Sequence, residues 1–256
     1  MTEHVKIQEN GAVLEILFAR PEKKNALSNA MYRAMSDALE SARTNNNVRV
    51  VLFGAEGESF TAGNDLADFA AVATGASAEL EAHAFLDQLA RTDKPIVAAV
   101  PGLAVGVGTT MLLHCDVVYL AESATLSTPF VNLALVPEAA SSLLLPARIG
   151  HVAAFAMFCL GESLSAQHAM ALGLANKVLP AEQVLPAARE AARTLATRAL
   201  GAIVATKKLM RDRERVLTQM RNEEAIFRER LRTDEAREAL AAFFERRPPD
   251  FSKFAP

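Results

Sequence analysis

The sequence predicts an α/β fold whose last part consists of helices alone. Short apolar runs typical of buried strands recur between helical segments up to about residue 180. From about Ala181 onward the pattern is helical without visible strands. Half of the 256 residues (51%) are hydrophobic, enough for a sizeable core. We therefore expect a core over residues 1–195 and a C-terminal helical region over residues 196–256.

Charge and cysteine content exclude several classes of protein. A formal net charge of -3 gives no electrostatic reason to expect nucleic acid or an acidic membrane surface as a partner. Cys115 and Cys159 lie in apolar runs without a CxxC spacing, which favours buried reduced thiols over a disulfide or zinc site. The N-terminus lacks a signal-peptide pattern, and the apolar runs are too short to span a membrane. We expect a cytoplasmic protein.

The first elements follow from local signals. An Asn-Gly pair at residues 10–11 predicts a tight hairpin between strands at Val5–Glu9 and Ala12–Phe18. Ser28 can cap a helix with one apolar face, and a strand follows at Val48–Phe53. The later predicted elements are a helix at Ala76–Thr92, strands at Ile96–Val100 and Val117–Leu120, helices from Pro137 to Ile149, Val152 to Leu160 and Ser165 to Leu172, and an extended piece at Asn176–Leu179.

The stretch from Ile96 to Ser142 contains two predicted helix starts close together. The Gly-containing loop at residues 105–108 enters one helix, so its free backbone N–H groups can bind an anion or a polarised carbonyl. The other start carries a single carboxylate, Glu138, among Leu, Val and Ala residues. Aimed donors and one acid in an apolar setting are the minimal equipment for making and stabilising an enolate.

Glu138 has two interpretations. Proline at the first helical position and an acid in the first turn are also typical of any stable helix. The surrounding apolar residues favour a catalytic role instead, because burial raises the pKa of a carboxyl group toward neutral pH.

Two segments resemble motifs of the crotonase (enoyl-CoA hydratase/isomerase) superfamily. Residues 60–66, Phe-Thr-Ala-Gly-Asn-Asp-Leu, are similar to its F-x-A-G-x-D-L segment, and residues 100–108 resemble its glycine-containing second signature. The match runs from residues 20–27 to the Arg-Arg-Pro at 246–248. The resemblance implies a spiral of repeated ββα units and a helical C-terminal region that builds a homotrimer or a dimer of trimers. It also implies an acyl-CoA thioester substrate, with no separate cofactor and no metal.

The resemblance also implies functional residues. The backbone N–H groups of Asn64 and Val107 form an oxyanion hole, in which one donor typically contributes about 2.7–4 kcal/mol of transition-state stabilisation. Coenzyme A contacts are expected at three residues of the first motif, Ala62, Asp65 and Leu66. They are also expected at four basic residues, Arg20, Lys23, Lys24 and Arg246. Plain surface charge remains the alternative for the basic residues, and a local backbone cap is favoured for Asp65.

The superfamily motifs do not define the reaction. A hydratase that resembles the archetype carries two glutamates, at positions that here read Thr110 and Phe130. Residues 128–142, with Glu138 after Pro137, are similar to the T-P-F … P-E-G-x-S-S run of the peroxisomal-type Δ3,Δ2-enoyl-CoA isomerases, where that glutamate is the base. Ala139 departs from the usual glycine. The resemblance therefore implies transfer of a proton from C2 to C4 of a 3-enoyl-CoA by Glu138.

Several alternatives remain open. An enzyme of the same fold can have another outcome, such as hydration with a water site rebuilt around Glu138, thioester hydrolysis or decarboxylation. A non-catalytic acyl-CoA or acyl-lysine binding module would bind without turnover. An RNA-binding role lacks a basic stripe, because the charges from Glu223 to Glu238 alternate in sign and indicate a solvated helix face. The five histidines lack metal-ligand spacing, and no G-x-G-x-x-G or G-x-S-x-G motif is present.

Overall fold

A computed structural model describes residues 2–68 and 81–254 and contains a six-stranded sheet in the order β1-β2-β3-β5-β7-β10. β1 and β2 are antiparallel, and the other neighbours are parallel. The strands of this sheet are β1 Val5–Asn10, β2 Val13–Phe18, β3 Val50–Ala55, β5 Ile96–Val100, β7 Val117–Ala121 and β10 Lys177–Leu179. Strands β3 and β5 are almost wholly buried, in accord with their continuous apolar sequences.

A second, smaller sheet has the order β4-β6-β8-β9. Its strands are β4 Ser59–Thr61, β6 Leu103–Val105, β8 Thr125–Ser127 and β9 Leu164–Ser165. Each of the pairs β3-β4, β5-β6 and β7-β8 places its first strand in the large sheet and its second strand in the small one. Because β4, β6 and β8 are parallel neighbours, the loops that follow them gather at one edge of the small sheet.

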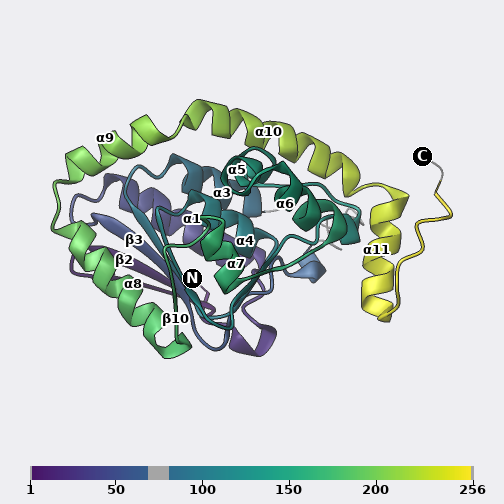
Figure 1. The fold of residues 1–256 in the computed structure, drawn as a ribbon, viewed down its shortest axis with the longest axis horizontal. Helices are drawn as coiled ribbons and strands as arrows, with labels where there is room; N and C mark the ends of the chain where they lie inside the picture. The colour runs from purple at the N-terminus through teal and green to yellow at the C-terminus, as the bar shows by residue number, and fades with distance from the viewer. Residues whose placement is uncertain (1, 69–80, 255–256) are drawn as a thin grey trace.

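Helices cover the sheets and extend the chain beyond them. The helices are α1 Asn29–Thr44, α3 Ala82–Arg91, α4 Val107–Thr110, α5 Ser141–Ile149, α6 His151–Phe155, α7 Ala166–Ala171, α8 Ala181–Ala196, α9 Leu200–Met210, α10 Arg213–Arg230 and α11 Asp234–Glu245. Helix α8 packs on β3, β5 and β7 of the large sheet. Helices α9 and α10 arch along the upper rim in Figure 1, and α11 turns down at the right.

The α/β prediction and most predicted elements are confirmed. The hairpin pairs Asn10 with Val13, and the Ser28 hydroxyl accepts a hydrogen bond from the Met31 N–H at the start of α1. After residue 181 the described chain contains helices alone, as predicted. Residues 76–80 of the predicted helix at Ala76–Thr92 lie outside the described residues, and the rest of it corresponds to α3.

The predicted helix start at Pro137 and Glu138 is wrong. Helix α5 begins only at Ser141, because Ala139 and Ala140 have φ values of 63° and 54° and form a left-handed turn in front of it. Left-handed conformations cost a non-glycine residue roughly 1–2 kcal/mol each. Glu138 therefore lies in a loop, and its presence is not explained by helix stability.

Close backbone contacts fix the loops after β4 and β6 against each other. Gly63 has a φ of 91°, and a Cβ atom there would lie 3.0 Å from the Val105 carbonyl oxygen. At Gly102, just before β6, a Cβ atom would lie 2.0 Å from the carbonyl oxygen of Glu58, just before β4. Only glycine permits these approaches, so these two positions set the spacing of the small sheet.

Substituting Gly102 tests this spacing. We expect Gly102→Ala to lower the free energy of unfolding by about 2–3 kcal/mol, because the new Cβ overlaps backbone that cannot move away as a flexible side chain can. The matched control is Gly201→Ala in α9, where a Cβ meets nothing within 4 Å and should raise stability by about 0.5–1 kcal/mol. Urea denaturation of both variants measures the difference, and equal effects would contradict this account.

Candidate active site

The loops after β4 and β6 present backbone N–H groups at the edge of the small sheet. Asn64 follows Gly63, and Val107 is the first residue of α4. The carbonyl oxygens of the two preceding residues are occupied: Gly63 accepts from the Leu27 N–H at 2.8 Å, and Gly106 accepts from the Thr109 N–H at 2.9 Å. In the described part of the chain, neither the Asn64 nor the Val107 N–H donates to a backbone carbonyl. Both amides are thus available to a ligand, as an oxyanion hole requires.

A cavity of about 820 Å³ opens at this edge. It is lined by residues of the loops after β4, β6 and β8, by the basic residues Arg20 and Lys23, and by Phe227, Phe243 and Phe244 of the two last helices. Its volume is within the range of sites for small molecules and cofactors. Among its described lining residues, the carboxylates are Asp65 and Glu138.

Glu138 is the buried carboxyl group of the cavity. Its side chain comes from the loop before α5, and the residue is only 5% exposed. Burial, reinforced by the charge of Glu223, raises its pKa from 4.5 to about 8. Its Oε1 atom is buried without a hydrogen-bond partner among the described residues. A carboxyl group with such a pKa and a free oxygen can accept and return a proton near neutral pH.

Tyr32 holds the side chain of Asn64 in the loop after β4. Its buried hydroxyl donates a hydrogen bond of 2.5 Å to Oδ1 of the Asn64 side chain. Burial, followed by the charges of Glu138 and Asp68, holds the pKa of Tyr32 well above its usual value, so the phenol stays a donor. Tyr32 thereby fixes the orientation of the Asn64 side chain.

Glu223 of α10 supports the loop that carries Glu138. Its Oε1 atom accepts a hydrogen bond of 2.9 Å from the Ser142 N–H and a further bond from the Ser142 hydroxyl. Because α5 has no side-chain cap of its own at Ala140, this distant carboxylate caps its first turn. The interpretation of Glu223 as part of a solvated helix face is wrong, since the residue is only 5% exposed.

His114 holds the next residue of the same loop. Its Nε2 atom lies 2.8 Å from the Ala139 carbonyl oxygen, and its Nδ1 atom lies 2.6 Å from Nη2 of Arg211. Burial and the Arg211 charge lower the pKa of His114, so the ring is neutral. A guanidinium can only donate, hence Nδ1 accepts and Nε2–H donates to Ala139. This contact restrains the left-handed turn that follows Glu138.

The other predicted contacts divide into two groups. Ala62, Asp65, Leu66 and Lys23 line the cavity, as does Arg20. Lys24 and Arg246 are exposed and lie outside the lining of this cavity. The backbone carbonyl of Lys24 accepts a hydrogen bond of 2.9 Å from the Ala62 N–H.

Asp65 acts as a local cap, as its sequence context predicts. Its Oδ1 atom accepts from the Ala67 N–H at 3.1 Å, and its Oδ2 atom accepts from Arg20 Nη1 at 2.8 Å. Burial favours the neutral acid, but these hydrogen bonds and the Arg20 charge outweigh it and lower the pKa of Asp65. An ionised, paired carboxylate of this kind is not suited to proton transfer.

Thr110 and Phe130, the positions at which the resemblance implies the two glutamates of a hydratase, differ in their relation to the cavity. Phe130 lines the cavity and is 6% exposed, whereas Thr110 is fully buried in α4. Tyr32, His114 and Glu223 support the site, but sequence reasoning did not find them. Their only local signal is a polar group on an otherwise apolar helix face or run, and their partners are far away in the chain.

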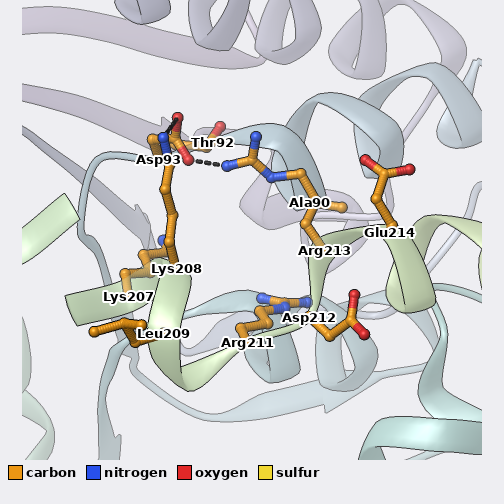
Figure 2. A pocket seen from close by; sticks show the side chains of 10 residues that line it. All are labelled: Ala90, Thr92, Asp93, Lys207, Lys208, Leu209, Arg211, Asp212, Arg213 and Glu214. Carbon is orange, nitrogen blue, oxygen red and sulfur yellow. Dashed lines mark hydrogen bonds and ion pairs between the residues drawn. The ribbon is translucent and has the colours of Figure 1, made fainter. Parts of the chain in front are cut away.

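A second concave region lies where α9 meets α10 (Figure 2). Several of its charged groups are paired, either within the region or with residues outside it. Asp93 accepts from Arg213 and lies 3.2 Å from Nζ of Lys208, and Arg211 turns inward to His114. The described lining of this region contains no buried carboxyl group without a hydrogen-bond partner, in contrast to Glu138 in the large cavity.

Residues 2–68 and 81–254 also bear on metal binding and membrane insertion. No group of three or more His, Cys, Asp or Glu side chains is placed to hold a metal ion in this part of the chain. None of its helices combines the length and apolar composition needed to cross a membrane.

Comparisons with known proteins agree with this geometry. The family model described as enoyl-CoA hydratase/isomerase matches residues 8–253. A solved enoyl-CoA hydratase/isomerase from Pseudoalteromonas atlantica superimposes with a TM-score of 0.91 and 40% identity, covering 97% of this chain and all of that one. The protein thus has the α/β crotonase fold.

The chain belongs to the enoyl-CoA hydratase/isomerase family and is an enzyme of that family. It is 33% identical over 251 residues to the rat (Rattus norvegicus) enoyl-CoA delta isomerase 2, covering 95% of this chain and 64% of the rat protein. It is 32% identical over 241 residues to 2,3-dehydroadipyl-CoA hydratase of Escherichia coli, covering 93% and 94%. The chain therefore spans under two thirds of the rat protein, and its relatives include both isomerases and hydratases.

The raised pKa of Glu138 predicts a dependence of stability on pH. Between pH 4.5 and about 8 the unfolded chain carries an ionised Glu138 while the folded chain keeps it protonated, so this group lowers stability as pH rises. Glu138→Gln removes that loss. We expect its free energy of unfolding, relative to the native protein, to increase by on the order of 3–5 kcal/mol from pH 4.5 to pH 8. Denaturant titrations at both pH values measure the change, and a pH-independent difference would contradict the assignment.

Proposed function

We propose that the protein converts a 3-enoyl-CoA to the conjugated 2-enoyl-CoA, with Glu138 as the acid–base group. The observation that carries this proposal is a single buried carboxyl group, unpaired at Oε1, in a cavity that also exposes the oxyanion loops. Double-bond migration needs one group that removes a proton and returns it. Hydration by the two-glutamate route would need two glutamates, and this sequence has Thr110 and Phe130 at the positions expected for them.

The proposed mechanism has three steps. The N–H groups of Asn64 and Val107 bind the thioester oxygen, which lowers the cost of removing a proton from C2. Glu138 takes that proton, and the negative charge spreads into a dienolate held by the two N–H groups. Protonated Glu138 then returns a proton to C4. The apolar wall formed by Phe130 and Leu135 keeps water from competing at the dienolate.

Coenzyme A binding and assembly complete the proposal. Lys23 lines the cavity, which supports a role in binding a phosphate of the coenzyme, and Lys24 and Arg246 would contribute from farther out. We also propose that residues 196–256 oligomerise, as a homotrimer or a dimer of trimers. Leu209 and Met210 of α9 support this because they are 90% and 82% exposed, an unusual cost for large apolar side chains in a monomer.

Hydration of a 2-enoyl-CoA is the second candidate function. The 32% identity to 2,3-dehydroadipyl-CoA hydratase over most of both chains favours it. It would require Glu138 to activate water without the two glutamates of the archetype, because Thr110 and Phe130 occupy those positions.

A product assay separates the two candidates. Native protein is offered a short 3-enoyl-CoA and the matching 2-enoyl-CoA, and products are resolved by chromatography. We expect conjugated 2-enoyl-CoA from the first substrate and no 3-hydroxyacyl-CoA from the second. Glu138→Gln should lower kcat by roughly 10²–10⁴-fold, because it removes the proton acceptor.

The control for this assay is Glu122→Gln, an exposed carboxylate outside the lining of the cavity, which should leave kcat unchanged. Hydration that Glu138→Gln leaves intact would mean that another group is the base. Tight acyl-CoA binding without turnover of either compound would favour a binding module.

Glu223 should influence the pH dependence of the same reaction. Its charge is the second cause of the raised Glu138 pKa, so Glu223→Gln should move the acidic limb of kcat/KM to lower pH. The glutamine oxygen can still accept from the Ser142 N–H, so the loop should keep its cap. A pH–rate profile from pH 5 to 10 measures the effect, and an unmoved limb with unchanged stability would show that Glu223 only supports the loop.

A further inference from the structure

Glu138 also borders a small cavity, which is separate from the large cavity of the candidate active site. The small cavity has a volume of about 40 Å³ and lies between α3 and α10. Its described lining includes His83 and Leu86 of α3, Leu217, Met220 and Glu224 of α10, and Glu138 itself. Glu138 is thus shared by the large cavity, which contains the oxyanion loops, and a small one that does not.

Two buried polar atoms of this lining make no hydrogen bond among the described residues: Oε1 of Glu138 and Nδ1 of His83. Nδ1 of His83 lies 3.3 Å from Oε1 of Glu224 without forming a hydrogen bond to it. Buried polar atoms are normally satisfied, by protein or by ordered water. One water needs roughly 10–15 Å³ of such space, and the cavity offers about 40 Å³. Size and chemistry therefore both suit a water molecule.

The small cavity leads toward the protein surface through His83. The His83 side chain is 14% exposed, and its Nδ1 atom lies 3.3 Å from Oε1 of Glu224. The Glu224 side chain is 31% exposed and accepts hydrogen bonds from Arg228 at 2.6 and 2.9 Å. Polar groups thus continue from the cavity to solvent along the seam between α3 and α10.

We propose that the small cavity is a water site through which Glu138 exchanges its acidic hydrogen with solvent, with His83 as the residue that holds the water. This inference rests on the proposed role of Glu138 as the acid–base group. In the exchange, the carboxyl O–H breaks as its hydrogen passes to the water oxygen, and a hydrogen of the water passes to the carboxylate. No net charge forms, and no co-reactant other than water is needed.

The route gives Glu138 a contact with solvent that a bound acyl chain does not block. With substrate in the large cavity, Glu138 can return the hydrogen taken from C2 directly to C4. Alternatively, it first exchanges that hydrogen with solvent and then delivers a solvent hydrogen to C4. His83 is a positioning residue in this scheme, since it contacts the water and not the substrate. Its imidazole stays neutral because burial lowers the pKa of His83.

The test is isomerisation of a 3-enoyl-CoA in D₂O, stopped at low conversion, with mass spectrometry of the 2-enoyl product. We expect the native enzyme to place solvent deuterium at C4. His83→Phe removes the polar ring atom, and it should lower that deuterium content several-fold while changing kcat by less than a factor of two. His83→Gln keeps a polar group toward the cavity and should restore exchange.

The matched control is Asp87→Asn, which alters another lining residue and leaves His83 in place. It should incorporate deuterium as the native enzyme does. A native product without deuterium, or equal deuterium in His83→Phe and native products, would overturn the inference. Thermal melting of each variant separates a folding defect from a loss of exchange.

Failure of the proposed function would be distinguishable from failure of the water site. If no conjugated product forms, the isomerase proposal fails whatever the isotope content. Deuterium exchange at C2 of a saturated acyl-CoA then tests the water site alone, because that exchange needs only the oxyanion donors and Glu138. Loss of C2 exchange in His83→Phe, but not in Asp87→Asn, would support the site, and equal exchange would overturn it.

Discussion

The parallel pairing of three very short strands is the constraint on which the rest of the site depends. β4, β6 and β8 contribute three residues each, yet their ends bring together the loops that carry Asn64 and Val107 and the cavity-lining segment that leads to Glu138. Such short strands are not stable alone, so they depend on the large sheet that alternates with them along the chain. The approach of the Gly102 backbone to Glu58 fixes their separation.

The environment of Glu138 disfavours the ionised form of its carboxyl group. Burial raises the pKa of Glu138, and the turn after it holds two alanines in left-handed conformations. Both features reduce stability, and both are supported by contacts from distant residues: Glu223 caps α5, and His114, oriented by Arg211, holds the Ala139 carbonyl. Two of these residues, Glu223 and Arg211, belong to the C-terminal helical part, which therefore shapes the site as well as covering it.

The fold and the chemistry are separable in this family. Two free backbone N–H groups, as at Asn64 and Val107, suit any reaction that places negative charge on a thioester oxygen, so they are compatible with isomerisation and with hydration alike. What differs is the set of acids around them. Here Phe130 lines the cavity where the hydratase archetype carries a glutamate, and Glu138 stands among apolar side chains. The distribution of carboxylates, and not the fold, is the feature that distinguishes the proposed reactions.

The sequence by itself determined the α/β class, the hairpin and the capped helix after Ser28, because these depend on local signals such as Asn10-Gly11 and Ser28. It also identified Glu138 as an acid in an apolar run. The sequence did not reveal the small sheet, because strands of three residues are too short to show an alternation of apolar and polar side chains. It also did not reveal the true start of α5, because alanine is not a residue that signals a left-handed turn. The roles of Tyr32, His114 and Glu223 were decided only by tertiary structure. Their partners lie 25 to 81 residues away, and hydrogen bonds over such separations leave no pattern in the local sequence.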